Sequence, residues 1–450
     1  MNESLMNTRT TTGTGVFFTL LMVANSVSSA TRTLIPPMLT TLRGAFPTLA
    51  SDEPFGLLLS IATLLMGVST LLWGILADRH SKRILLAVTT LGWGAVNLLA
   101  GIPPISFELF VIYQILNAFL IGAIIPVGLA ITAEMYPTKS YGLRFGWFTT
   151  GTNLGFGLGY VLGGFVPTTG WWNLPYFGIG MVGIGLGIVF SGTSIPKNQD
   201  KWPTGKEISD RGQANPAPSS ETGQIAPALR VSRADVKNIL GDRANRLIIL
   251  IALFGVIPTS AFGGWFIRFL TVDHGIVEDS GTLVLFLLFA SQLAGMVVLG
   301  AIADKREAKR PNGRLSILSW VTILGTIGTI WAIAVPFWMT TPDLFVYFAN
   351  ANFSTFFVLL FVGTFLTSVI GPLTMVIIVN NAPKHLQAST IAINFLFITV
   401  GSSVGILLCS TLATAFFAGT YTWSFVIINL FYVPSIFCIL KLLKQNGNRR

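Results

Sequence analysis

The chain has 450 residues, of which 52% are hydrophobic and only 10% are charged, and its mean hydropathy is +0.71. Soluble domains carry about 25% charged residues, so this composition excludes a soluble enzyme. A single-span receptor is also excluded, because about 20 apolar residues cross a bilayer and the apolar content suffices for about ten to twelve spans. The composition therefore predicts a helical membrane protein that crosses the bilayer many times.

Apolar segments of membrane-spanning length follow one another along the whole chain, separated by short charged or Pro/Gly-rich breaks. An even number of spans places both termini on the same side of the membrane. The twelve predicted spans cover residues 16–37, 55–77, 84–101, 107–133, 144–166, 173–194, 245–270, 281–303, 315–337, 352–379, 388–410 and 419–440.

The basic residues indicate which side is cytoplasmic. If the N-terminus is cytoplasmic and the loops alternate, all but three of the 28 Lys and Arg residues lie on the cytoplasmic side, the exceptions being Arg32, Arg43 and Arg268. Lys and Arg are enriched in cytoplasmic loops, so both termini are expected in the cytoplasm. Topology then explains the net charge of +10 without a nucleic-acid partner. We expect a multi-pass protein of a cell membrane, the inner membrane of a prokaryote.

One long hydrophilic segment, residues 196–243, interrupts the spans. Its first part is rich in Pro, Ser, Gly and charge, which is typical of a flexible linker. From Ser232 onward, Val236, Ile239 and Leu240 share one helix face, which predicts a short helix at the membrane surface, with a solvated tether as the alternative. The predicted domains are an N-terminal six-helix bundle, a cytoplasmic linker and a C-terminal six-helix bundle, at residues 1–195, 196–243 and 244–450.

Short motifs recur in the same order in the two halves of the sequence. Gly74 and Asp78-Arg79 return as Gly300 and Asp304-Lys305, and at the same spacing the acidic pair Asp52-Glu53 returns as Glu278-Asp279. Later motifs recur at a longer spacing, which indicates an insertion before the tenth span; these are Pro137, Gly155 and Gly159, which return as Pro383, Gly401 and Gly405. The repeat predicts two related six-helix bundles.

The loop after the second span resembles a signature of the major facilitator superfamily of secondary transporters. It reads Gly74-Ile-Leu-Ala-Asp78-Arg79-His80-Ser81-Lys82-Arg83, against the family pattern G-x-x-x-D-R-x-G-R-R, with Ser81 in place of the second glycine. The resemblance covers essentially the whole chain. It implies an all-α membrane protein of twelve transmembrane helices in two pseudo-symmetric six-helix bundles, which transports solute by alternating access.

Charged residues at the cytoplasmic helix ends are candidates for a gate. A carboxylate at the negative C-terminal end of a helix needs a partner, and Asp78 stands at such an end. The resemblance implies a cytoplasmic charge network of Asp78, Arg79, Arg83, Glu134 and Arg144. Gly74 and Asp304, from the two copies of the loop motif, are further gating candidates. Asn380 and Thr390 replace Glu134 and Arg144 in the second copy, so its network is expected to be weaker. The alternative is that these charges only set the topology.

Glycines recur every fourth residue in the fifth span, at Gly151, Gly155, Gly159 and Gly163. Such a stripe lets a neighbouring helix approach closely. Whether this contact is static or slides during a transport cycle stays open.

The first span carries the main candidate for substrate binding. Asn25, Ser28, Ser29 and Arg32 are spaced to lie on one helix face. A charged residue inside a span usually faces a cavity, and Arg offers fixed donors for a carboxylate or phosphate. The alternative is that Arg32 reaches outward to the membrane interface. Arg268, near Asp273, is expected at that interface.

Uncharged polar residues inside other spans are the remaining binding candidates. In the family that the chain resembles, these spans line the central cavity. The candidates are Gln114, Asn117, Thr259, Gln292 and Asn394. Around Arg32 the chain resembles Spinster-type transporters, in which an acid commonly precedes the arginine, whereas Thr31 stands here. No acid lies near the middle of a span, and an embedded carboxylate is common in proton-driven transporters, so the sequence does not support proton coupling. The choice between ion-coupled and uncoupled transport stays open.

Chemistry other than transport has no support in the sequence. No span holds a catalytic set, the His and Cys residues are scattered, and Thr204-Gly205-Lys206 lacks the glycine and Ser/Thr of a phosphate loop. We therefore expect no enzyme, catalytic residue, metal or cofactor. The expected function is transport of a small organic or amphiphilic solute, with lipid-like and anionic solutes among the candidates, by a monomer among membrane lipids. The alternatives are a uniporter without ion coupling and a non-transporting sensor of the same fold.

Overall fold

The computed structural model describes residues 2–49, 51–103, 105–136, 141–166, 170–196, 239–339, 343–381 and 387–448. Within these ranges the chain is helical and forms no β-strand. Most of the predicted linker lies outside the described residues. Of the helix expected from Ser232, only the end from residue 239 is described; it is helical, and Ile239 is buried against the second half.

The first half of the chain contains eight α-helices and two short 3-10 turns within the described residues. They are α1 (Asn2–Ala30), η1 (Thr31–Thr33), η2 (Pro36–Met38), α2 (Leu39–Ala45), α3 (Glu53–Arg79), α4 (Lys82–Ala100), α5 (Phe107–Ile121), α6 (Ile124–Met135), α7 (Tyr141–Phe165) and α8 (Leu174–Gly192).

The second half has a related plan, but it adds the short helix α14, divides its last span into α18 and α19, and has no counterpart of α2 among the described residues. Its elements are α11 (Arg243–His274), α12 (Glu278–Lys309), α13 (Gly313–Ala334), α14 (Leu344–Ala349), α15 (Ala351–Thr367), α16 (Ile370–Asn381), α17 (Gln387–Phe416), α18 (Thr422–Asn429) and α19 (Tyr432–Asn448). The insertion predicted before the tenth span falls at α14, on the connection between α13 and α15.

The predicted set of spans is confirmed by the helices. Among the described residues, 11 helical segments are long and apolar enough to cross a membrane. The glycine-rich α7, a helix of 25 residues, occupies the position of the remaining predicted span. The twelve-helix, all-α architecture that the repeat predicted is therefore present.

Proline breaks three spans that the sequence predicted to be continuous. Pro126 has no N–H to bond the carbonyl of Gly122, and the helix stops between α5 and α6 at that carbonyl. Pro372 and Pro434 produce the same break four residues upstream, between α15 and α16 and between α18 and α19. The continuous spans predicted at 107–133, 352–379 and 419–440 are corrected accordingly.

The first span is interrupted in a related way. Its α-helix ends at Ala30, although the prediction continued it to residue 37, and the chain passes through η1 before the pair Pro36-Pro37 begins η2. Because η1 consists of Thr31–Thr33, the candidate Arg32 lies on a 3-10 turn instead of a regular helix face.

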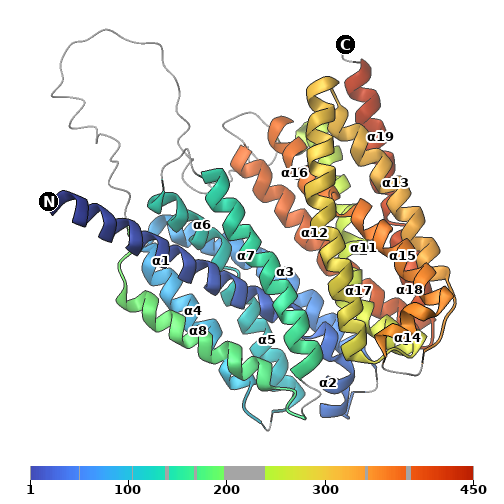
Figure 1. Ribbon diagram of the computed structural model, residues 1–450, viewed down its shortest axis with the longest axis horizontal. Helices are drawn as coiled ribbons and strands as arrows, with labels where there is room; N and C mark the ends of the chain where they lie inside the picture. Colours follow the sequence, from blue (N-terminus) through green and yellow to red (C-terminus); the bar gives the residue numbers. More distant parts are fainter. Residues whose placement is uncertain are drawn as a thin grey trace.

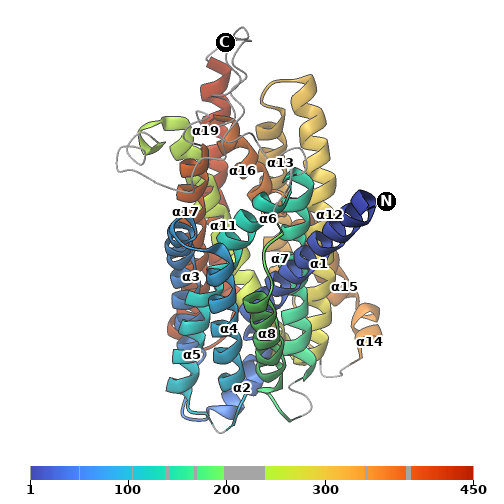
Figure 2. The ribbon, with the colours of Figure 1, turned by 90° about the vertical axis from the view of Figure 1, so that its left-hand side faces the viewer.

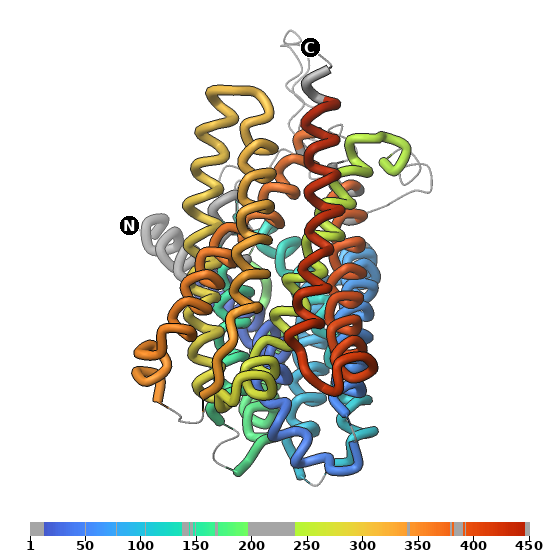
Figure 3. Tube along the Cα trace, turned by 90° about the vertical axis from the view of Figure 1, so that its right-hand side faces the viewer, coloured from blue at the N-terminus to red at the C-terminus, as the bar shows by residue number. Residues whose placement is uncertain are grey.

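The two halves form two bundles that lie side by side, with α3 packed on α17 and α7 packed on α12. They meet near α2 and diverge toward the end of the molecule that bears the C-terminus (Figure 1). Figure 2 shows that α2 and the C-terminus lie at opposite ends of the molecule. We call these ends the α2 side and the terminal side. Figure 3 shows that α14 also lies at the α2 side, whereas the α12–α13 turn extends to the terminal side.

Glycines bring equivalent helix pairs together in both bundles. A Cβ atom added to Gly155 of α7 would collide with the Ser26 carbonyl of α1, and one added to Gly401 of α17 would lie 2.6 Å from the Leu253 carbonyl of α11. One turn further on, Gly159 and Gly405 meet the carbonyls of Ala30 and Ile257. The glycine stripe therefore packs as predicted, and the matching contacts relate α1 to α11 residue by residue.

These contacts predict a selective loss of stability. We expect Gly155→Ala to destabilise the protein by about 1–3 kcal/mol, because the added methyl group must displace the α1 backbone. Thermal unfolding in detergent measures this change. The matched control is Gly157→Ala in the same helix, where the nearest atom to the added Cβ is a Phe286 ring carbon at 3.8 Å. Equal melting temperatures for the two variants would contradict the packing described here.

Candidate functional site

A cavity with about 430 Å³ of empty space, part of it open to solvent, lies in the first half between η1, α3 and α5. It has polar groups on η1 and α5 and apolar side chains on α3. Its lining residues are Thr31, Arg32, Ile35, Leu58, Leu59, Ala62, Thr63, Met66, Gln114, Asn117, Ala118 and Ile121. Of the predicted binding residues, the structure thus brings Arg32, Gln114 and Asn117 together.

Arg32 supplies the only positive charge among the residues that line this cavity. Its guanidinium carbon lies 4.9 Å from the centre of the Phe156 ring on α7, a cation–π contact of about 0.5–2 kcal/mol. The ion pairs between described residues involve other side chains, so no described carboxylate neutralises Arg32. Its N–H donors are therefore available to an anionic ligand.

Hydrogen bonds hold the polar wall beside Arg32 in place. The Asn117 amide donates to the Thr31 hydroxyl at 3.2 Å and accepts from the Asn97 amide at 2.8 Å. Thr31 in turn donates to the Ser28 carbonyl at 2.7 Å. All three side chains are buried, so this chain of bonds links α4, α5 and η1 and fixes the orientation of Asn117 at the cavity.

The shared helix face predicted for the first span is corrected by the structure. The Asn25 amide points to α7, where it donates to the Phe148 carbonyl at 2.8 Å and the Thr152 hydroxyl at 2.9 Å. Ser29 packs against Gly155, and the Ser28 hydroxyl bonds the Asn25 carbonyl at 3.0 Å. None of these three residues lines the Arg32 cavity. Arg32 lines the cavity from the 3-10 turn η1 and also contacts Phe156 of α7.

A second cavity, with about 620 Å³ of empty space that includes open solvent, lies in the second half. It is lined by two of the predicted binding residues, Thr259 of α11 and Gln292 of α12. The Thr259 hydroxyl donates to the Gly255 carbonyl at 2.9 Å, whereas no hydrogen bond joins Gln292 to another described residue. Since Ile257 is the counterpart of Ala30, Thr259 occupies the place that Arg32 has in the first half. This cavity has no charged lining residue.

Asn394 is not placed beside either cavity. It is fully buried in α17, and neither its amide nitrogen nor its amide oxygen has a hydrogen-bond partner among the described residues. Its position in the interior of the second bundle differs from the cavity-lining position that the sequence predicted.

At the terminal side, the described ion pairs each lie within one half. Glu134, a member of the predicted network, pairs with Lys82 at 2.7 Å, and the guanidinium of Arg144 lies 4.3 Å from the centre of the Tyr136 ring. Asp304 pairs with Arg314 at 2.8 Å. Lys82 and Arg314 were missed because nothing in a single sequence distinguishes them from neighbouring cations.

The other predicted gating residues stand apart from any described contact between the halves. Arg83 donates to the Ser191 carbonyl at the end of α8, Gly74 is buried in α3, and Arg79 is exposed at the end of that helix. Asp78 lies in α3, but its side chain is outside the described residues.

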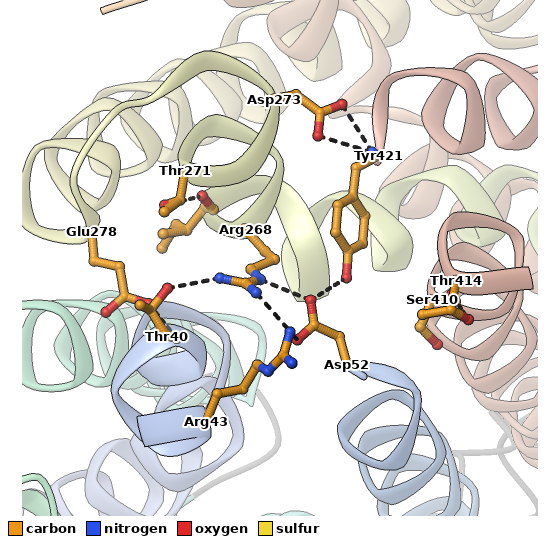
Figure 4. A network of polar contacts seen from close by, with 11 residues as sticks. Thr40, Arg43, Asp52, Arg268, Thr271, Asp273, Glu278, Ser410, Thr414 and Tyr421 are labelled. Atoms are coloured by element: carbon orange, nitrogen blue, oxygen red, sulfur yellow. Dashed lines mark hydrogen bonds and ion pairs between the residues drawn. The ribbon is translucent and has the colours of Figure 1, made fainter. Parts of the chain in front are cut away.

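At the α2 side, Asp52 joins the two halves (Figure 4). Only 5% of Asp52 is exposed, and its carboxylate accepts from Arg43 of its own half at 3.2 Å. From the other half it accepts from the Arg268 Nε at 2.8 Å and the Tyr421 hydroxyl at 2.8 Å. Burial and the Asp52 carboxylate raise the pKa of the Tyr421 phenol, which therefore stays protonated and donates.

A second carboxylate makes the reciprocal contact. Glu278 of the second half accepts from the Thr40 backbone N–H of the first half at 2.6 Å, and Arg268 donates to the Thr40 hydroxyl at 2.9 Å (Figure 4). Asp273 accepts from the Tyr421 backbone N–H at 2.8 Å and holds this residue toward Asp52. Arg268 was expected at the interface near Asp273, but its ion-pair partner is Asp52.

Deeper contacts continue this closure between the halves. The Ser60 and Ser403 hydroxyl oxygens lie 2.6 Å apart where α3 meets α17, and the Tyr160 hydroxyl donates to the Gly263 carbonyl at 3.0 Å. The α2 side is thus closed by direct polar contacts. The protein therefore combines a cavity that contains the unneutralised Arg32 with a contact between the two halves that closes the α2 side.

Comparison with known proteins agrees with this architecture. The chain is 31% identical to multidrug resistance protein MdtG of Erwinia billingiae (strain Eb661) over 96 residues, which are 21% of this chain and 23% of that protein. It is 24% identical to a probable hexose phosphate transport protein of Chlamydia pneumoniae over 297 residues, 64% of this chain and 65% of that protein. The chain thus matches less than two thirds of the length of either relative.

Solved structures show the same fold. A bacterial homologue of the human lysosomal transporter Spinster, in an inward-facing and unoccupied conformation, aligns with a TM-score of 0.74 and 16% identity, over 96% of this chain and 98% of that one. A D-xylose-proton symporter aligns with a TM-score of 0.60 and 14% identity, over 94% of this chain and 96% of that one. The Spinster likeness expected from the sequence is thus found in the fold.

The Major Facilitator Superfamily model matches residues 21–347, which are more than half of the chain. The resemblance noted in the loop after the second span is therefore confirmed, and the chain belongs to the major facilitator superfamily of membrane transporters.

Proposed function

We propose that the protein is a secondary transporter that moves a small organic or amphiphilic anion by alternating access. The observation that carries this proposal is Arg32, a guanidinium that lines a cavity and has no described carboxylate partner. A charge at this depth of a span is costly and marks a substrate path. A carboxylate or phosphate group of the solute supplies the missing counter-charge.

The remaining lining residues suit the rest of such a solute. Gln114 and Asn117 offer neutral hydrogen-bonding groups beside Arg32, while Leu58, Leu59 and Met66 form an apolar wall opposite them. The second cavity adds Thr259 and Gln292 without a charge. One anionic group with an adjoining apolar or uncharged polar portion therefore matches the two cavities. Names of relatives support an organic substrate, because one is a hexose phosphate transport protein.

The conformation supports alternation between two open states. The α2 side is closed by Asp52, Arg268 and Tyr421, whereas the described ion pairs at the terminal side stay within one half. The excess of Lys and Arg on the terminal side favours its assignment to the cytoplasm. The state is then inward-facing, which agrees with the conformation of the Spinster homologue. We place the protein in the bacterial inner membrane, with both termini cytoplasmic.

The role of Arg32 predicts the outcome of a thermal-shift screen with sugar phosphates, fatty acids and neutral analogues. We expect anions to raise the melting temperature of the wild type and to have no such effect on Arg32→Ala, because the variant lacks the counter-charge. Gln292→Ala is the matched control, since it removes an uncharged lining residue and keeps Arg32. Anions that stabilise the wild type and Arg32→Ala equally would show that Arg32 is not the anchor.

The closure of the α2 side predicts a shift of conformational population. We expect Arg268→Gln to lower the population of the α2-side-closed state about tenfold or more, because Asp52 loses its charged partner from the other half. Pulsed electron paramagnetic resonance between spin labels at Thr48→Cys and Thr420→Cys measures the separation of the halves. Arg314→Gln is the control, because it removes an ion pair within one half. Equal distance distributions in the two variants would refute this role of Arg268.

A further inference from the structure

The charge in the two cavities is asymmetric. Arg32 lines the first cavity, and Thr259 stands in the equivalent place of the second. The other polar lining residues near them, Gln114, Asn117 and Gln292, are neutral. Without a solute, the cavities therefore carry one positive charge among their lining residues.

Reorientation of the two halves changes the surroundings of this charge. Between the inward-open and the outward-open state, the cavity must close to both sides, and Arg32 then loses contact with bulk water. A dehydrated, unpaired cation is strongly unfavourable, and the Phe156 ring at 4.9 Å offsets only part of that cost. A bound anion cancels the charge before the cavity closes. The loaded protein can therefore reorient readily, and the empty protein cannot.

We infer that this transporter is an obligate anion exchanger, which returns across its cycle only when a second anion occupies Arg32. The inference rests on the proposed function and specifies its mode. One anion moves inward for each anion that moves outward, so the protein does not catalyse net uptake and needs no coupling proton or sodium ion. The exchanged solutes share an anionic group, either a carboxylate or a phosphate.

Thr31 provides the means to test this mode. It lines the same cavity next to Arg32, and its hydroxyl, which bonds Ser28 and Asn117, carries no charge to neutralise Arg32. Thr31→Asp places a carboxylate on this wall and Arg32→Gln removes the cation, so both variants lower the net charge of the empty cavity by one. Arg32→Lys keeps the charge and is the matched control.

The experiment is single-molecule fluorescence energy transfer on the full chain in nanodiscs, in Tris chloride without phosphate or organic anions. The dyes are attached at Thr48→Cys and Thr420→Cys, which are exposed on the α2 side of the two halves, after replacement of Cys409 and Cys438 by Ala. We expect the wild type and Arg32→Lys to remain in one state. We expect Arg32→Gln and Thr31→Asp to switch between two states at least about ten times more often.

Addition of anions extends the same measurement. We expect inorganic phosphate, glucose 6-phosphate or laurate to accelerate switching of the wild type and to leave the rate of Arg32→Gln unchanged. Acceleration by the phosphates alone identifies a phosphate-bearing solute, and acceleration by laurate alone identifies a carboxylate.

Two results would overturn different parts of this account. If the empty wild type switches as often as Arg32→Gln, the exchange inference is wrong, while transport by alternating access stands. If no variant switches in any condition, the halves do not alternate and the proposed function itself is wrong. Should Arg32→Gln aggregate during size-exclusion chromatography, Thr31→Asp decides between the same outcomes, because it retains Arg32.

Discussion

The unneutralised charge of Arg32 is the constraint on which the functional reading of this structure depends. A guanidinium within a spanning segment requires water or an anion, and η1 places Arg32 at a cavity. The regular helix before this turn packs its Asn25 and Ser29 side chains on α7. Pro36 and Pro37 have no N–H for the carbonyls of Arg32 and Thr33, which accounts for the end of the regular helix near Arg32.

Duplication explains how the cavity is closed at one side. Asp52 and Glu278 are equivalent residues of the two repeats, and each one accepts hydrogen bonds from the opposite half. The equivalent acidic residue of each repeat therefore forms a contact between the bundles. The glycine contacts of α7 with α1 and of α17 with α11 repeat in the same manner, so each bundle holds its first helix firmly. Rigid bundles with reciprocal contacts at one end suit rocking of one half against the other.

Much of this architecture could be predicted from the sequence, because spans, orientation and repeats depend on local composition and on spacing. The glycine stripe and the position of Arg32 in a cavity came from the same kind of evidence. The contact of Asp52 with Arg268 and Tyr421 could not be predicted from the sequence, because these residues lie far apart in the chain and meet only when the two bundles pack together. The direction of Asn25 could not be predicted either, because it depends on which neighbouring helix, α7, packs on that face of α1. The helix breaks coincide with Pro126, Pro372 and Pro434, but proline alone does not predict a break, because Pro258 lies within the continuous helix α11.

The distribution of ion pairs explains how the two open states can remain close in free energy. When the α2 side opens, Asp52 loses Arg268 and Tyr421 but keeps Arg43 of its own half and gains water. At the terminal side, Glu134 and Asp304 already have partners within their own halves, so closure there need not leave either carboxylate unpaired. Neither state then contains an isolated buried carboxylate from this set, and the difference between them can be a few kcal/mol, which is about the range that a ligand with unequal affinity can reverse. Arg32 is not balanced in this way among the described residues, and under the proposed function its counter-charge is that of the solute.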